Sequence, residues 1–289
     1  MRALYPGAPH ATLCLPFCKL KQDLARCHYL ASTDGNRLSA VVAHTRSAIE
    51  FTWCRPGRAE TLSNLIAQVE HRLPALAFLP VVETEAGDWT APPGLQSRGR
   101  FFRGVLGEGR RGRRALPAGF EFAPFDPESD LGAAAELLGA CEPRLAAHMG
   151  PGQLGRITRS DYYFADGWFF LRDRALGRRV GLAINGCCPE FGEGFVDWIQ
   201  VLPAHRGRGL GTAMLSEALR RLEHARFVTV SGSLDDLRAG ELFARCGFRQ
   251  MRRWTILARP EGAPEPGAPS LGAGAGSPSR LRGAASAEG

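Results

Sequence analysis

Lysine is almost absent from this sequence: of its 36 basic residues only Lys19 and Lys21 are lysines, and the rest are arginines. The sequence also lacks an apolar run of the roughly 18 residues that a membrane-spanning helix needs. The first ten residues, MRALYPGAPH, contain no hydrophobic core of a secretion signal. These absences predict a cytoplasmic protein that does not interact with a membrane.

Paired C-x-x-C arrangements, which are typical of structural zinc sites, are also missing. The eight cysteines are scattered along the chain. Cys14, Cys18, Cys27 and Cys54 lie nearest to a metal-binding set, but their spacing argues against one. We therefore expect reduced thiols and no bound metal.

Positive charge is concentrated in one segment of a chain whose formal net charge is +7. Seven arginines lie between Arg98 and Arg114, against the single acid Glu108. Such a run can bind nucleic acid or another polyanion. Because glycines are interspersed through it, we interpret the run as a solvated linker and do not expect nucleic-acid binding.

The stretch from Phe195 to Glu223 organises the chain. It reads as a buried strand, a glycine-rich turn from Arg206 to Gly211, and an amphipathic helix. Backbone N–H groups of such a turn point into one concavity, and the helix dipole adds about half a positive charge. Glycines allow close approach and positive φ, and the two arginines of the turn add fork-shaped donors. The stretch predicts a site for a phosphate-bearing ligand.

The spacing of the glycines selects among phosphate-binding loops. A P-loop requires a lysine after its glycines, and none follows here. A dinucleotide fingerprint requires G-x-G-x-x-G, which the spacing of Gly207, Gly209 and Gly211 does not match. What remains is Arg-x-x-Gly-x-Gly, at Arg206, Gly209 and Gly211, directly after a predicted strand.

This pattern resembles the pyrophosphate-binding motif of the GNAT superfamily of acyl-CoA-dependent N-acyltransferases. A second segment, from Asp236 to Phe248, resembles the C-terminal helix and turn of that family, and a short strand from Phe227 to Ser231 lies between the two. The resemblance covers roughly residues 119–259. It implies an α/β (α+β) fold, a mixed central sheet flanked by helices, with acetyl-CoA as cosubstrate.

The resemblance also implies which residues contact the cosubstrate. The amides of the glycine turn would bind the pyrophosphate, and Val201 on the strand would lie along the pantetheine. The residues assigned to acetyl-CoA binding are Val201, Leu202, Arg206, Gly207, Arg208, Gly209, Leu210, Gly211, Thr212, Asp236 and Phe243.

The catalytic residues are less well marked. Asp197 is the best candidate for the general base, and strand alternation predicts that it shares a face with Ile199 and Val201. Glu190 and Glu193, in the preceding turn, are second choices. The remaining candidates lie on the expected acceptor wall: Tyr162, Tyr163 and His148.

Two positions depart from the family pattern. Many members have a tyrosine at the position of Phe243, placed to protonate the departing thiolate, and phenylalanine has no proton to give. Tyr162, Tyr163 or Ser233 could replace it, or the thiolate leaves unaided. Asp236 stands where the family usually has asparagine.

The N-terminal part of the chain repeats the element order of the C-terminal part. It is predicted as strands at 27–32, 38–45 and 49–53, a helix at 59–73 and a strand at 76–83. This order suggests a tandem arrangement with a degenerate first unit, or alternatively an unrelated small α/β domain. Arg55-Pro56-Gly57-Arg58 replaces the glycine turn, and its proline lacks a donor N–H.

The predicted organisation has four parts. Residues 1–106 form the N-terminal α/β domain, whose first 13 residues we expect to be poorly ordered because of Pro6, Gly7 and Pro9. Residues 107–117 are the basic linker and 118–259 the acetyltransferase domain. Residues 260–289, dominated by Gly, Ala, Pro and Ser, are predicted to be disordered.

The sequence therefore predicts an acetyl-CoA-dependent N-acetyltransferase that acts on a primary amine of a small molecule or peptide. One alternative is an acyl-CoA-binding sensor of the same fold without turnover. A third reading is a nucleic-acid- or ribosome-associated protein. The identity of the acceptor and the formation of a homodimer stay open.

Overall fold

The structure, a computed structural model, describes residues 5–46, 48–72, 79–82, 96–107, 114–143 and 148–258. The described chain forms two compact units. The first comprises residues 5–19 and 102–252, and the second comprises residues 20–101 and 253–258.

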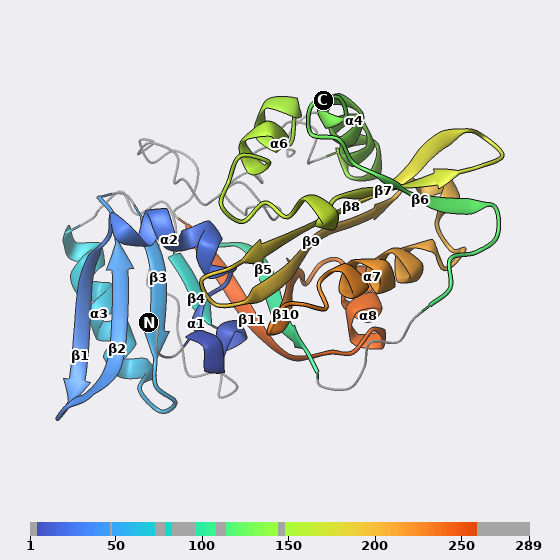
Figure 1. The fold of residues 1–289 in the computed structure, drawn as a ribbon. Coiled ribbons are helices and arrows are strands. Elements are labelled where there is room, and N and C mark those ends of the chain that lie inside the picture. The colour runs from blue at the N-terminus through green and yellow to red at the C-terminus, as the bar shows by residue number, and fades with distance from the viewer. Residues whose placement is uncertain are drawn as a thin grey trace, which may run out of the picture. The chain divides into compact units, whose positions relative to one another are not determined.

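A mixed sheet is the centre of the first unit (Figure 1). Its strands follow the order β5-β10-β9-β8-β7-β6, where β5 enters the unit at Phe102. Neighbours from β6 to β9 are antiparallel, whereas β9 and β10 run parallel. The strands are β5 (Gln96–Leu106), β6 (Phe120–Pro124), β7 (Phe169–Asp173), β8 (Arg178–Cys188), β9 (Glu193–Val201) and β10 (Phe227–Ser233).

Helices cover both faces of this sheet (Figure 1). On one face α4 and α6 bury apolar side chains against Phe170, Leu182 and Trp198. On the other face α7 and α8 pack over Val196, Ile199 and Val201. The helices are α4 (Leu131–Cys141), α6 (Pro151–Ile157), α7 (Leu210–Arg221) and α8 (Leu237–Arg245), with the 3-10 turns η2 (Ala165–Gly167) and η3 (Pro203–His205).

The amphipathic pattern explains why α7 lies where it does. Leu210, Met214 and Ala218 recur at a helical spacing and are all buried. On the outer face Glu217 accepts hydrogen bonds from Arg220 and Arg221. The predicted helix is confirmed, and it supports the glycine turn that precedes it.

The second unit contains an antiparallel sheet in the order β1-β2-β3, and helix α3 packs against it. β4 pairs antiparallel with the last part of β11. The elements of the second unit are β1 (His28–Asp34), β2 (Arg37–His44), β3 (Ile49–Cys54), α3 (Ala59–Arg72) and β4 (Leu79–Val82), and β11 (Phe248–Ala258) enters this unit at Arg253. The core contains Val42, Ile49, Ile66 and Val69. The predicted element order is confirmed.

The start of the chain differs from the prediction. Residues 5–19 belong to the first unit, although they were expected to belong with the rest of the N-terminal domain. They form η1 (Tyr5–Gly7), α1 (Pro9–Thr12) and the first turn of α2 (Phe17–Ala25). Poor ordering was wrong for residues 5–13, because the Tyr5 and Leu13 side chains are fully buried.

Other predicted segments lie partly or wholly outside the described residues. Residues 108–113, in the arginine run, are among them, as is the whole predicted tail, residues 260–289. Of the predicted strand at 76–83 the structure describes residues 79–82. No helix within the described ranges is both long and apolar enough to cross a membrane.

Candidate functional site

The turn before α7 has the geometry of an anion-binding loop. Gly207 and Gly209 adopt φ values of 80° and 77°, in the left-handed region that favours glycine. Gly209 is the N-cap of α7, so the first amides of the helix, from Leu210 to Thr212, have no acceptor inside it. Apart from the neighbouring residues, no atom lies within 4 Å of a Cβ built on either glycine, so both positions face open space.

The two arginines of the turn have different surroundings. Arg206 donates from Nε to the Val201 carbonyl at 3.0 Å and from a terminal nitrogen to the Cys141 carbonyl at 2.9 Å. The guanidinium of Arg206 therefore holds the turn against β9 and α4. We expected this group to donate to a phosphate, and these two hydrogen bonds give it a structural role. Arg208 is exposed at the turn. Arg206 is exposed as well, so both arginines of the turn reach solvent.

The partner strands β9 and β10 part in the middle of the sheet. Their parallel pairing runs from Glu193 opposite Phe227 to Val196 opposite Val230. β9 continues to Val201 and β10 to Ser233 beyond that last pair. Backbone groups of β9 after Val196 therefore face the gap between the two strands.

Asp197 sits at a β-bulge at this point. On β8 the consecutive residues Ile184 and Asn185 pair with Trp198 and Val196, so Asp197 is the extra residue of β9. The bulge changes which side chains share a face. Asp197 contacts Lys19 on the face that carries Phe195, whereas Ile199 and Val201 pack toward α7. The predicted common face of Asp197, Ile199 and Val201 is wrong, because alternation does not continue through a bulge.

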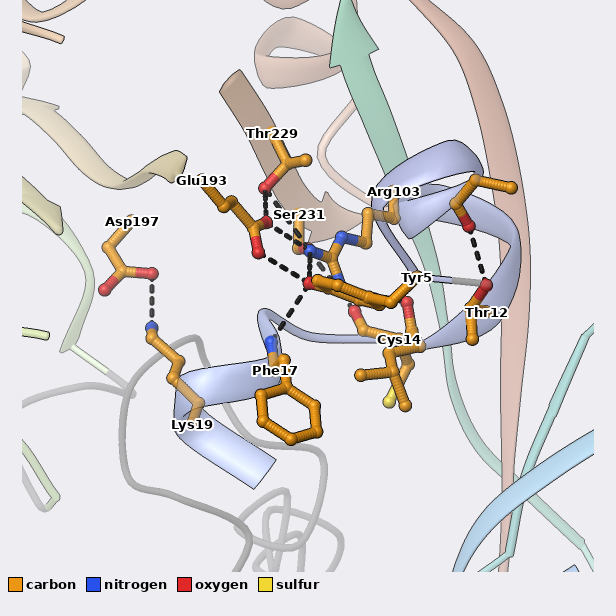
Figure 2. Close-up of polar contacts among 12 residues, drawn as sticks. Tyr5, Thr12, Cys14, Phe17, Lys19, Arg103, Glu193, Asp197, Thr229 and Ser231 are labelled. Atoms are coloured by element: carbon orange, nitrogen blue, oxygen red, sulfur yellow. Dashed lines mark hydrogen bonds and ion pairs between the residues drawn. The ribbon is translucent and has the colours of Figure 1, made fainter. Parts of the chain in front are cut away.

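The carboxylate of Asp197 forms a buried ion pair (Figure 2). Lys19 Nζ lies 2.5 Å from Asp197 Oδ1, and the side chains are 0% and 6% exposed. The ammonium also lies over the rings of Phe195 and Tyr162, 4.9 Å and 5.9 Å from their centroids. Burial raises the pKa of Asp197, and the charge of Lys19 opposes that shift.

A second buried polar cluster lies beside the first (Figure 2). Arg103 donates to Glu193 Oε1 at 2.5 Å and to the Tyr5 hydroxyl at 2.8 Å. Tyr5 donates to Glu193 Oε2 at 2.6 Å, and Thr229 donates to Oε1 at 2.5 Å. Phe17 N donates to the Tyr5 hydroxyl at 3.0 Å. The cluster joins residues 5–19, which we call the N-terminal segment, to β5, β9 and β10.

Arg103→Met should destabilise the protein by about 3–5 kcal/mol, because it leaves the buried Glu193 carboxylate without its cation. Urea denaturation measures the loss. Arg245→Met is the matched control, since Arg245 and Glu241 form a pair in which both side chains are 71% exposed. The control should change the free energy of unfolding by less than about 0.5 kcal/mol. Equal effects of the two substitutions would contradict a structural role of the cluster.

The structure separates the two predicted tyrosines. Tyr162 faces the ion pair, and burial, followed by the charge of Asp197, raises its pKa to about 12. Tyr163 packs edge-on against Trp168 at 5.6 Å, in the cluster under α4 and α6. Its hydroxyl is buried without a hydrogen-bond partner among the described residues. Only Tyr162 is brought to Asp197.

The second-choice acids and the other candidates lie elsewhere. Glu190 is exposed in the turn before β9, and Glu193 is held in the buried cluster by Arg103. His148 is half-buried in the turn that precedes α6. Ser233 ends β10 and accepts a hydrogen bond from Asp235 N at 3.1 Å.

The two positions that depart from the family pattern, Asp236 and Phe243, have clear structural roles at α8. Asp236 is the N-cap, and its Oδ1 accepts from Ala239 N at 3.0 Å, as an asparagine oxygen also would. Phe243 is buried, with ring centroids 6.1 Å from Phe102 and 5.7 Å from Phe248. A hydroxyl-free ring suits that apolar cluster.

Val201 and Leu202 lead from β9 into the glycine turn. Val201 is buried against α7, and its carbonyl accepts from Arg206. Leu202 N donates to the Val180 carbonyl at 2.9 Å. These bonds fix the end of β9, so the turn starts from a defined position.

Sequence reasoning missed the partners from the N-terminal segment and β5, namely Lys19, Tyr5 and Arg103. Lys19 carried one available signal: it is one of only two lysines, in a chain that otherwise uses arginine. Tyr5 carried none, because its partner Glu193 lies 188 positions away. Arg103 was counted in the arginine run interpreted as a solvated linker, which is wrong for this residue, because its side chain is fully buried.

Comparisons with known proteins agree with this geometry. Residues 165–250 match the family described as "Acetyltransferase (GNAT) domain". That segment contains β7 to β10, the glycine turn, α7 and α8. The predicted superfamily is therefore confirmed for this segment. No curated protein sequence matches the chain.

Solved structures show the same fold over most of the chain. A GCN5-related N-acetyltransferase from Sphaerobacter thermophilus has a TM-score of 0.60 and 16% identity, covering 90% of this chain and 94% of that one. A GNAT-family acetyltransferase from Colwellia psychrerythraea has a TM-score of 0.57 and 11% identity, covering 89% and 95%. A tandem GNAT protein from the clavulanic acid biosynthesis pathway has a TM-score of 0.53 and 18% identity, covering 87% and 90%. Each likeness extends beyond residues 165–250, into both units.

Proposed function

We propose that the protein is an acetyl-CoA-dependent N-acetyltransferase whose acceptor is a primary amine of a small molecule or peptide. The observation that supports this proposal concerns one continuous stretch of the chain, from β9 to the start of α7. β9 parts from β10 after Val196, Asp197 is the bulge residue at that point, and the left-handed Gly209 precedes α7 twelve residues later.

The residues present suit an acyl-CoA. Gly207 and Gly209 face open space, and the amides of Leu210 to Thr212, at the positive end of the helix dipole, would bind a pyrophosphate. Backbone groups of β9 beyond Val196 face the gap and would hold the pantetheine and the acyl carbonyl. When bound, acetyl-CoA supplies the activated acyl group.

Asp197 is the proposed general base. Its carboxylate lies at the bulge and already binds an ammonium, that of Lys19. A raised pKa suits a base that must accept a proton from an amine near neutral pH. Tyr162 is a poor choice for the acid, since a phenol with a pKa of about 12 holds its proton more tightly than a thiol with an ordinary pKa of about 8.5. We assign its ring to the wall of the amine site and propose that the thiolate leaves without a protein acid.

Two measurements test the proposal. Calorimetric titration with acetyl-CoA should show binding of one equivalent, and absence of binding at millimolar ligand would overturn it. Release of CoA across a panel of primary alkyl amines, aminoglycans and amine-bearing peptides should identify at least one acceptor.

The second candidate function is acyl-CoA binding without turnover. Two observations favour it: Phe243 provides no proton, and Lys19 already occupies Asp197. Binding of acetyl-CoA with no release of CoA across the whole amine panel would support this candidate and exclude the transferase.

The second unit supports the tandem arrangement as a proposal. Its order β1-β2-β3-α3-β4 repeats β7-β8-β9-α7-β10. Gly57 has φ 78° just before α3, as Gly209 has φ 77° just before α7. Arg55 donates to the Leu38 carbonyl at 2.6 Å, in the same place relative to its helix as Arg206. Pro56 removes one amide from this turn, so we assign acetyl-CoA binding to the first unit alone.

A further inference from the structure

The surroundings of Lys19 form a binding site for a primary ammonium. A carboxylate oxygen of Asp197 lies 2.5 Å from Nζ, and two aromatic faces, Phe195 and Tyr162, lie over it. An anion combined with aromatic faces is the arrangement that desolvated alkylammonium groups favour. Gly186 makes room for the ring of Phe195, because a Cβ at position 186 would lie 2.2 Å from that ring.

The place of this ammonium matters as much as its partners. Asp197 is the bulge residue, next to the last paired residue of β9, where the gap toward β10 begins. In an acetyltransferase built on this strand, the amine that reacts must lie beside the base and next to this gap. The Nζ atom of Lys19 occupies that position in the chain's own structure.

Hydrogen bonds hold the N-terminal segment at the point where it places Lys19 beside Asp197. The Tyr5 hydroxyl accepts from Phe17 N at 3.0 Å and donates to Glu193 on β9 at 2.6 Å. Arg103 donates to the Leu13 carbonyl at 3.0 Å, and Ser231 Oγ on β10 donates to the Cys14 carbonyl at 3.3 Å. Both strands that border the gap therefore hold the segment (Figure 2).

We propose that Lys19 is itself an acyl acceptor, and that the protein acetylates the Nζ atom of its own Lys19. This inference rests on the proposed function. Asp197 takes a proton from the Lys19 ammonium, and the free amine attacks the thioester carbonyl carbon. A C–N bond forms and the C–S bond breaks, so CoA leaves as the thiolate and the amine loses its second proton to it or to solvent. The products are an N-acetyl-lysine amide and free CoA.

The reaction is intramolecular. Lys19 Nζ lies 2.5 Å from the Asp197 carboxylate of its own chain, so the base and the acceptor belong to one molecule. The amide product carries no charge, so acetylation leaves Asp197 without the cation that now neutralises it.

Peptide mapping by mass spectrometry tests the proposal on the full chain. With acetyl-CoA and no added amine, one acetyl group should appear on Lys19, with a rate independent of protein concentration. Lys21 is the internal control, since it is the only other lysine and lies two positions away. Lys19 should react at least about 100-fold faster than Lys21, as expected for base-assisted transfer. Equal labelling of the two lysines would show uncatalysed chemistry and overturn the proposal.

Variants separate this inference from the proposed function. Lys19→Arg should accept no acetyl group, while Lys21→Arg should be labelled at Lys19 as the natural chain is. Gly209→Glu, which should not bind acetyl-CoA, should show no label on Lys19. If the natural chain binds acetyl-CoA and acetylates an external amine, yet Lys19 stays unmodified, the inference is wrong and the function stands. If acetyl-CoA does not bind, both fail.

Discussion

Gly209→Glu should abolish acetyl-CoA binding, raising its Kd by more than about 100-fold. Gly209 caps α7 at φ 77°, and the amides behind it form the proposed pyrophosphate site. A glutamate side chain would place a carboxylate at the positive end of the helix, where it competes with the pyrophosphate and repels it. It would also strain the left-handed backbone by about 1–2 kcal/mol. Calorimetric titration with acetyl-CoA measures the loss.

The control for this substitution must reproduce both the strain and the charge. Gly177, in the turn between β7 and β8, has φ 64° and, like Gly209, has no atom within 4 Å of a built Cβ. Gly177→Glu should therefore cost similar stability and leave acetyl-CoA binding unchanged. Gly209→Asn keeps a residue that tolerates the left-handed region, so it should weaken binding far less than glutamate. Binding of acetyl-CoA by Gly209→Glu with natural affinity would remove the pyrophosphate site from this turn.

The parts of the fold that the sequence predicted correctly are those set by local patterns. The α7 face follows from the spacing of Leu210, Met214 and Ala218, and its start follows from Gly209. The element order of the second unit follows from its β-rich composition, the turn at residues 33–36 and the apolar stripe of α3. Periodicity and turn chemistry act within a few residues, so a single sequence reveals them.

The parts that could not be predicted depend on contacts between distant residues. Lys19 meets Asp197 across 178 positions, and nothing near either residue indicates the other. The N-terminal segment looked unstructured because of its prolines, yet Tyr5 finds a buried partner in Glu193. The sequence of β9 did not indicate the bulge either, because a bulge is a property of the pairing of β9 with β8 and not of β9 alone.

Asp197→Asn should lower kcat/KM for an external amine by about 10²–10⁴-fold, the usual contribution of a general base. The natural protein should lose activity as pH falls through the pKa of Asp197, because only the carboxylate accepts a proton. Burial raises that pKa, so the acid limb of the profile should lie above the ordinary carboxyl range. CoA release measured against pH, with one amine throughout, gives both quantities.

The charge of Lys19 provides a directional check on this assignment. A positive charge at position 19 lowers the pKa of Asp197. Lys19→Met should therefore place the acid limb of kcat/KM at higher pH than Lys19→Arg, which keeps the charge and accepts no acetyl group. Lys21→Met should leave the limb in place. Because every variant is assayed with the same amine, titration of the amine cannot produce the difference.

Loss of activity in Asp197→Asn could also come from misfolding, because the substitution leaves the Lys19 ammonium buried without its anion. Breaking one side of such a pair costs about 3–5 kcal/mol, whereas replacing both partners by neutral side chains is often nearly neutral. The double variant Lys19→Met with Asp197→Asn should therefore recover most of the stability in urea and none of the activity. Glu190→Gln, at the exposed second-choice acid, should be fully active. Recovery of activity along with stability in the double variant would show that Asp197 supports the fold and takes no part in the proton transfer.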